Sequence, residues 1–305
     1  MTDTRMPAPG REMVADRLLR STAARSYDPE LDIDWSAPLV PGKGFILEHR
    51  CSLYGTTLWQ RLSPEQRMEL GKHEAASVAS TGIWLELMLM RILAKLSYRG
   101  DPASAHVQYA LTELGEECRH TIMFARMIEQ LGTPIYGPAP RIRALGNRLP
   151  ALATGPSMWA AILIGEEIPD RFQREQAADE SIQPLMRMVN RIHILEEARH
   201  ISFARAELPR SVAETGRAGL AYHRAVTARF AFIVASNLIN PEVYRSVGLD
   251  PHAARAAALA NPHYRETLRF GGQKIVAFLG DNGLIGSPGR YWWRRSLLVT
   301  KTASA

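Results

Sequence analysis

From about residue 63 onward, apolar residues recur with the period of an α-helix. No segment shows the apolar–polar alternation that is typical of a β-strand. The helical pattern stops at clusters of Gly and Pro, where helices usually end. The pattern therefore predicts an all-α fold with four long helices, over residues 63–98, 103–131, 157–177 and 181–208, and a further apolar helix over 211–238.

The boundaries of these helices suggest one main domain. Ser63 followed by Pro64 is a typical helix start, with Ser as the N-cap and Pro at the first helical position. We expect residues 63–305 to form a helical bundle that ends in shorter helices. Residues 1–62, with a short helix over 11–25, are expected to form a lead-in that wraps the bundle.

The second and fourth long helices contain the same pentad, E-E-x-R-H, at residues 116–120 and 196–200. Residues three apart lie on one face of a helix, so Glu117 points with His120, and Glu197 with His200. The two copies are 80 residues apart, and the same offset connects Glu86 in the first helix with Glu166 in the third. The four helices therefore read as two copies of one helical hairpin.

Each hairpin thus supplies one Glu and one Glu-x-x-His. Carboxylates among apolar neighbours are costly unless they are paired or bound to metal. This set is the one that ferritin-like di-iron and di-manganese bundles use. We therefore expect a ferritin-like four-helix bundle that binds two metal ions, iron in the first place and manganese as a possible substitute.

His193 is a seventh candidate ligand, because it precedes Glu197 by four residues on the same helix face. A lone buried histidine is more often a hydrogen-bonded core residue, but this one stands beside the repeated motif. Its counterpart in the first hairpin is Glu113, which is either a further ligand or an acid behind the ligands. The predicted metal ligands are Glu86, Glu117, His120, Glu166, His193, Glu197 and His200.

Several neighbouring residues have competing interpretations. Glu167 is a rival for Glu166, and the 80-residue offset favours Glu166. Glu116 and Glu196 point about 100° away from the ligands, so we expect them in surface ion pairs. Arg119 and Arg199 either support buried carboxylates or lie on the surface. Cys118 is expected to be a small core residue, and packing is the favoured role of Trp84 and Trp159 over lining an aromatic pocket.

These residues resemble the p-aminobenzoate N-oxygenase family, the AurF-type di-iron oxygenases. The resemblance rests on His193-x-x-x-Glu197-x-x-His200, on Ile182-Gln183-Pro184 eleven residues before His193, and on the spacing to Glu166. Glu86 and Glu117-x-x-His120 match the other ligand helices of that family, and the likeness covers roughly residues 25–240.

The resemblance implies a homodimeric, O₂-dependent di-iron monooxygenase that oxygenates the nitrogen of an arylamine-like substrate. An external ferredoxin or reductase would supply electrons. It names no catalytic residue beyond the metal ligands. Three alternatives remain open: a ferritin-like ferroxidase or iron-handling protein, a di-iron oxygenase acting on carbon, and a metal-free helical interaction module. About 95 residues after the fourth helix favour an enzyme with a covered pocket over iron storage.

Composition changes this picture little. The formal charge is +6, and residues 210–305 alone carry an excess of eight positive charges. These charges are scattered and 32 of the 37 bases are Arg, so we expect no nucleic-acid partner. We also expect no membrane span, because no stretch of about 18 uncharged apolar residues occurs. Two cysteines and no apolar leader core favour the cytoplasm.

Overall fold

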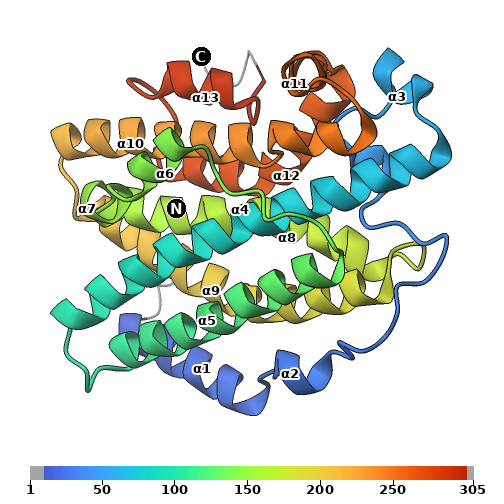
Figure 1. Ribbon diagram of the computed structural model, residues 1–305. Coiled ribbons are helices and arrows are strands. Elements are labelled where there is room, and N and C mark those ends of the chain that lie inside the picture. Colours follow the sequence, from blue (N-terminus) through green and yellow to red (C-terminus); the bar gives the residue numbers. More distant parts are fainter. Residues whose placement is uncertain (1–9, 301–305) are drawn as a thin grey trace, which may run out of the picture.

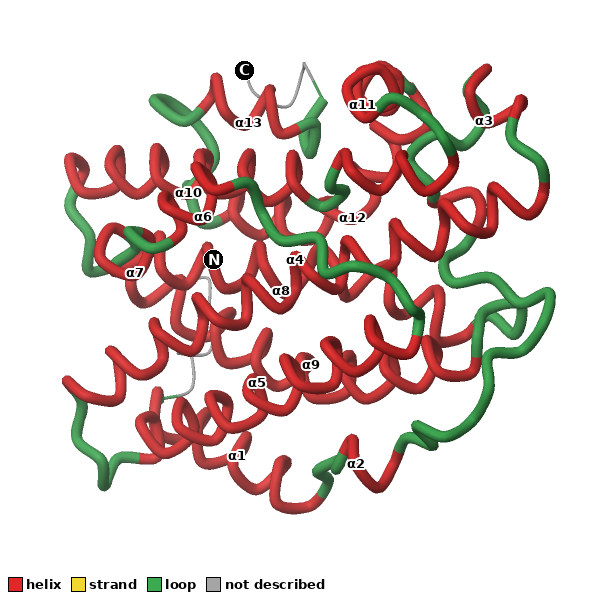
Figure 2. The backbone as a smooth tube through the Cα atoms, in the orientation of Figure 1, coloured by secondary structure: helices red, strands yellow, loops and turns green. Residues whose placement is uncertain are grey.

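The computed structural model describes residues 10–300, and every regular element within them is a helix (Figures 1 and 2). The only β-type pairing in this range is an isolated bridge between Gly44 and Ile182. The predicted all-α fold is thus confirmed. The four long helices are α4 (Pro64–Arg99), α5 (Ala105–Gln130), α8 (Gly155–Ala178) and α9 (Pro184–Ala213).

The ends of these helices follow from local chemistry. Ser63 caps α4 in a full capping box with Gln66, and Ser104 caps α5 through the backbone N–H of Val107. The helix α9 differs from the expectation, because it runs through Pro209 to Ala213 instead of ending at residue 208. Pro209 lies in the last turns, where it removes a single backbone hydrogen bond. Glu207 in the same turn forms an ion pair with Arg11.

The four long helices form a ferritin-like bundle. Helix α4 packs chiefly on α5, and α8 on α9. Between these two hairpins, residues 131–154, which include two short helices, carry the chain back along the bundle. Figure 2 shows the part before these helices as a loop that crosses α4. One long crossover of this kind is the mark of the ferritin-like topology.

The remaining helices cover the bundle. In Figure 1, α1 lies beneath α5, while α10 and α12 lie above α8. The helix expected over 211–238 begins later, at Arg217, because α9 is longer than expected. These elements are α1 (Arg11–Ala24), α2 (Pro29–Asp32), η1 (Glu48–Arg50), α3 (Thr57–Arg61), α6 (Pro140–Gly146), α7 (Leu149–Leu152), α10 (Arg217–Asn237), η2 (Pro241–Val247), α11 (Pro251–Ala260), α12 (Pro262–Asp281) and α13 (Arg290–Ser296).

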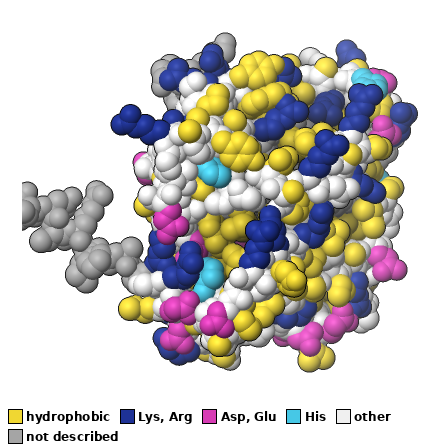
Figure 3. Space-filling model, turned by 90° about the vertical axis from the view of Figure 1, so that its left-hand side faces the viewer, with side chains coloured by type: hydrophobic (Ala, Val, Ile, Leu, Met, Phe, Trp, Pro, Cys, Tyr) yellow, Lys and Arg dark blue, Asp and Glu magenta, His cyan; other side chains and the backbone are white. Residues whose placement is uncertain are grey.

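Helix α4 is the one described helix that is long and apolar enough to cross a membrane by length and composition alone. Within its apolar window, 61% is buried inside the protein, and Glu74 and Glu86 on the same helix are buried too. These properties are those of the core helix of a bundle. On the face drawn in Figure 3, Lys and Arg side chains are scattered among hydrophobic and acidic ones.

Candidate metal centre

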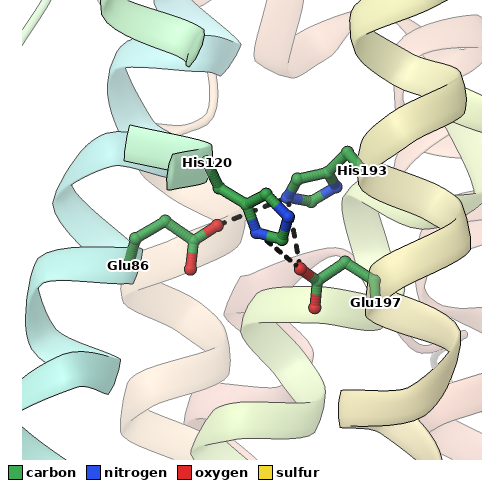
Figure 4. A group of neighbouring side chains, drawn as sticks. All are labelled: Glu86, His120, His193 and Glu197. Carbon is green, nitrogen blue, oxygen red and sulfur yellow. Dashed lines mark hydrogen bonds and ion pairs between the residues drawn. The ribbon is translucent and has the colours of Figure 1, made fainter. Parts of the chain in front are cut away.

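All seven predicted ligands converge in the middle of the bundle. Each is at most 3% exposed. Helix α4 contributes Glu86, α5 the first Glu-x-x-His, α8 Glu166, and α9 the remaining three residues. Figure 4 shows Glu86 reaching towards His120 and the α9 side chains. Potential ligand atoms lie within 4.8 Å of one another in three groups: Glu86–His120–His193–Glu197, Glu113–Glu117–His200 and Glu86–Glu117–Glu166.

Glu113 belongs to one of these groups. It is 1% exposed and lies with Glu117 and His200, one turn of α5 before Glu117. Its counterpart at the 80-residue offset, His193, lies in the group that contains His120. The two halves of the cluster therefore differ by one position, a carboxylate on one side and an imidazole on the other.

Glu117 and Glu197 lie between the two repeated histidines. His120 Nδ1 is 3.0 Å from an oxygen of Glu117 and 3.0 Å from an oxygen of Glu197. His200 Nδ1 is 2.9 Å from the other oxygen of each glutamate. Each carboxylate thus offers one oxygen to either half of the cluster, so both would be available to hold a pair of metal ions.

The outer nitrogen of each of these histidines is bound across the repeat. His120 Nε2 donates to Glu196 Oε2 at 2.8 Å, and His200 Nε2 donates to Glu116 Oε2 at 2.7 Å. With Nε2 holding a proton, loss of the Nδ1 proton on metal binding would leave the Nδ1 lone pair facing the cluster. Each pentad thus orients the histidine of the other.

The expected surface position of Glu116 and Glu196 is therefore wrong. They are 1% and 0% exposed, because the second face of α5 packs against α9 instead of facing water. Of the two roles considered for Arg199, the structure shows support of a buried carboxylate: Arg199 is buried and donates to Glu116 Oε1 at 2.7 Å. Arg119 is 3.8 Å from Glu196 Oε1, which places the second arginine beside the second of these carboxylates.

His193 presents the opposite ring nitrogen. Its Nδ1 donates to Gln173 Oε1 at 2.9 Å, so that Nε2 faces Glu86 at 3.4 Å and Glu197 at 3.6 Å. On α8, Glu166 faces the cluster, whereas its neighbour Glu167 is held by Arg205 in a two-pronged ion pair with both contacts at 2.6 Å. The 80-residue offset thus picks out the carboxylate that joins the cluster.

Burial and neighbouring charges raise the pKa of some carboxylates in the cluster and lower that of others. Burial, reinforced by nearby carboxylates, raises the pKa of Glu86 and of Glu166 well above the usual value, and burial raises the pKa of Glu113 to about 8. Burial also opposes charge on Glu117, but the adjacent His200 and His120 prevail and lower its pKa to about 2. So many carboxylates in one dry volume need positive partners, which are protons or metal cations.

Buried carboxylate oxygens without a hydrogen-bond partner indicate whether the cluster could hold a pair of metal ions. Glu86 Oε2 and Glu113 Oε2 are buried and have no hydrogen-bond partner among the described residues. Native proteins rarely leave buried polar atoms unpaired. Carboxylate oxygens and imidazole nitrogens form a donor set suited to iron and manganese. The residues therefore fit a two-metal centre.

Three other side chains clarify the surroundings. Cys118 is exposed, with its Sγ atom 3.3 Å from Met90 Sδ, so the expected core position is wrong. It lies on the outer face of α5, one position beyond Glu117. Trp159 packs against Phe203 and His106, and Trp84 covers Gly146, so packing is the role of both tryptophans.

A cavity of about 110 Å³ opens onto one edge of the cluster. Glu86, Glu166 and His193 form its inner end. From there it extends between α4, α8 and α9 on one side and α10 and α12 on the other. An organic molecule in this cavity would lie directly against the candidate metal ligands.

Comparison with known proteins agrees with this site. Residues 8–283 match the family model "P-aminobenzoate N-oxygenase AurF". An uncharacterized protein of Mycobacterium tuberculosis is 30% identical over 298 residues, 93% of this chain and 86% of that protein. An uncharacterized protein of Mycobacterium bovis is 34% identical over 211 residues, 65% of this chain and 62% of that protein.

Solved structures of R2-like ligand-binding oxidase mutants are more distant. One with an anaerobically reconstituted Mn/Fe cofactor has a TM-score of 0.48 at 12% identity, covering 87% of this chain and 93% of that one. Another, with an aerobically reconstituted Fe/Fe cofactor, has a TM-score of 0.41 at 14% identity, covering 97% and 92%. The family match spans both hairpins and every residue of the cluster, and the chain belongs to the p-aminobenzoate N-oxygenase AurF family.

Proposed function

We propose that the protein is an O₂-dependent di-iron monooxygenase that oxygenates the nitrogen of an amine. The observation that carries this proposal is the cavity that ends on Glu86, Glu166 and His193. A storage protein needs a route for ions, whereas an apolar cavity against the ligands serves an organic substrate. The family to which the chain belongs is named for N-oxygenation, which favours nitrogen over carbon.

In this proposal, seven residues hold the two ions, and Glu113 is an eighth candidate ligand. The seven are Glu86, Glu117, His120, Glu166, His193, Glu197 and His200. When bound, the iron pair would supply the binding site for O₂ and the electrons that activate it. The residues of the chain do the rest: Glu116 and Glu196 orient the two histidines, Gln173 orients His193, and the apolar walls keep water out. Electrons would come from an external ferredoxin-type or reductase-type donor.

Metal analysis and isotope labelling test this function. The purified protein should hold about two iron ions per chain. With ¹⁸O₂, a reductant and an arylamine, the product should carry ¹⁸O on nitrogen. Uptake of many irons per chain without consumption of amine would instead identify a ferroxidase, and label on carbon would identify a hydroxylase. A protein that cannot be loaded with metal would refute the whole proposal.

We also propose a homodimer, formed through the outer face of α4 and α5. Leu87, Leu111 and Ile122 on this face are 48%, 48% and 56% exposed. Leu111 and Ile122, eleven residues apart, lie on one face of α5, and exposed apolar residues that share a face are typical of a protein interface. Sedimentation should show a dimer, and I122E should give a monomer that still binds metal. A wild-type monomer would contradict the proposal. The cytoplasm is the expected location.

A further inference from the structure

The cavity is long. Along α4 its wall runs from Glu86 back to Glu74, twelve residues or about 18 Å of helix. Along α8 it runs from Glu166 to Gln176, or about 15 Å. The lining residues on two helices thus give similar extents. A molecule with its reacting group at the metal ligands can extend along these two helices towards Glu74 and Gln176.

Small and apolar side chains form the wall between the two ends. On α4 the cavity-facing residues between Glu74 and Glu86 are Ala75, Val78, Ala79, Thr81, Gly82 and Leu85. The hydroxyl of Thr81 donates to the backbone carbonyl of Asn237, so it presents no free polar group. The middle of the cavity therefore fits hydrocarbon.

Among the described residues, only two ionisable side chains line the cavity apart from the candidate metal ligands, and both have partners of their own. Arg50 donates to both oxygens of Glu175, at 2.9 and 2.8 Å, and its guanidinium lies 4.1 Å from the centre of the Phe270 ring. Glu74 accepts hydrogen bonds from the backbone N–H and the hydroxyl of Ser52. The cavity thus presents no unpaired cation.

Three amide side chains of the wall take part in hydrogen bonds, and its remaining polar groups are neutral. Asn190 donates to Gln176 Oε1 at 3.3 Å, and Gln173 accepts from His193. A carboxylate in this cavity would lose its hydration without gaining a charged partner, which is strongly unfavourable. An uncharged molecule meets no such cost.

We propose that the substrate of this chain is an elongated, uncharged amine, and that an aminobenzoate, whose carboxylate is ionised, is a poor ligand. This inference rests on the proposed function for the reacting group. It departs from the substrate for which the family is named. The amine lies at Glu86, Glu166 and His193, and an apolar body extends along α4 towards Glu74.

The test compares ligands that share one aniline ring. Binding of 4-aminobenzoate, 4-aminobenzamide and butyl 4-aminobenzoate is measured by calorimetry on the iron-loaded protein. The butyl ester should bind at least about 100-fold more tightly than 4-aminobenzoate, with the neutral amide in between. Equal or tighter binding of 4-aminobenzoate would overturn the proposal.

Two variants separate charge from length. E175Q releases Arg50, so it should raise affinity for 4-aminobenzoate about tenfold or more and leave the ester unchanged. A79L narrows the cavity about 10 Å from Glu86, so it should weaken the ester and spare the small amide. No change for 4-aminobenzoate in E175Q would show that the ion pair does not exclude anions. Equal loss of both ligands in A79L would refute the assigned path.

The outcomes distinguish this inference from the proposed function. Tight binding and turnover of 4-aminobenzoate would refute the inference and leave N-oxygenation standing. Tight binding of the ester, with two irons per chain but without oxygenated product, would refute N-oxygenation and keep the preference for uncharged ligands.

Discussion

Removing the Glu116 side chain tests whether the buried carboxylates behind the histidines control metal binding. Glu116 makes no contact with the cluster centre, but its two oxygens accept from His200 Nε2 and from Arg199, both at 2.7 Å. In E116A, His200 loses the partner that fixes its ring and its protonated nitrogen. Arg199 keeps Glu196 at 3.7 Å as a buried partner.

The size of the effect follows from these contacts. Loss of a carboxylate that orients a ligating histidine typically costs 10- to 100-fold in metal affinity, or about 1.4–2.7 kcal/mol. The fold should also lose about 1.5–3 kcal/mol, because a hydrogen bond to a buried charged group disappears. E196A should act in the same way through His120.

Competition with a calibrated chelator gives the affinity of each variant, and chemical denaturation gives its stability. E117A, which removes a proposed ligand, should abolish binding at that site. E129A on the exposed face of the same helix should match the wild type in both measurements. If E116A holds both metals with wild-type affinity while E117A loses them, the orienting role of Glu116 is wrong.

Three further predictions concern Glu113, Glu74 and removal of the metal ions. E113Q should weaken one of the two metals and leave the other, seen as half-loading by metal analysis; full loading would exclude Glu113 as a ligand. Burial raises the pKa of Glu74 to about 7 from 4.5, so the folded state favours its protonated form, and stability should fall by about 3 kcal/mol as pH rises from 4.5 to 7. Urea unfolding of E74Q should lack this part of the decline; an identical pH profile would refute it. Chelation should lower the melting temperature, since each ion held at 100 times its dissociation constant stabilises the fold by about 2.7 kcal/mol; an unchanged melting temperature would mean that the metals do not bind the folded protein selectively.

The four bundle helices could be predicted because the residues that begin and end most of them act through the local sequence. Ser63 and Pro64 begin α4, and the Gly and Pro residues after α4 and α5 end those helices, whatever the rest of the chain does. The end of α9 could not be predicted in this way. Pro209 predicts a helix end there, but a proline near the C-terminus removes only one backbone hydrogen bond, and the helix continues to Ala213.

The convergence of the seven candidate ligands could be predicted because the E-E-x-R-H pentad occurs twice at a fixed offset. Such a repeat indicates two similar hairpins that pack with the same faces towards each other. The position of Glu116 and Glu196 could not, because helical periodicity gives directions around one helix and not what covers each direction. A second acidic residue in both pentads was the available signal, since surface ion pairs have no reason to recur at the same offset. Cys118 was misplaced for the same reason: its Sγ atom contacts Met90, yet the side chain stays exposed to solvent.

The crossed hydrogen bonds between the pentads bear on how the protein assembles. Neither hairpin alone contains a complete site, since His120 on the first is oriented by Glu196 on the second, and His200 by Glu116 in return. A correctly oriented pair of candidate ligand histidines therefore arises only after residues some 80 positions apart have docked against each other. The same pattern has an evolutionary reading: a single ancestral hairpin would complete the arrangement only by pairing with a second copy of itself around a twofold axis.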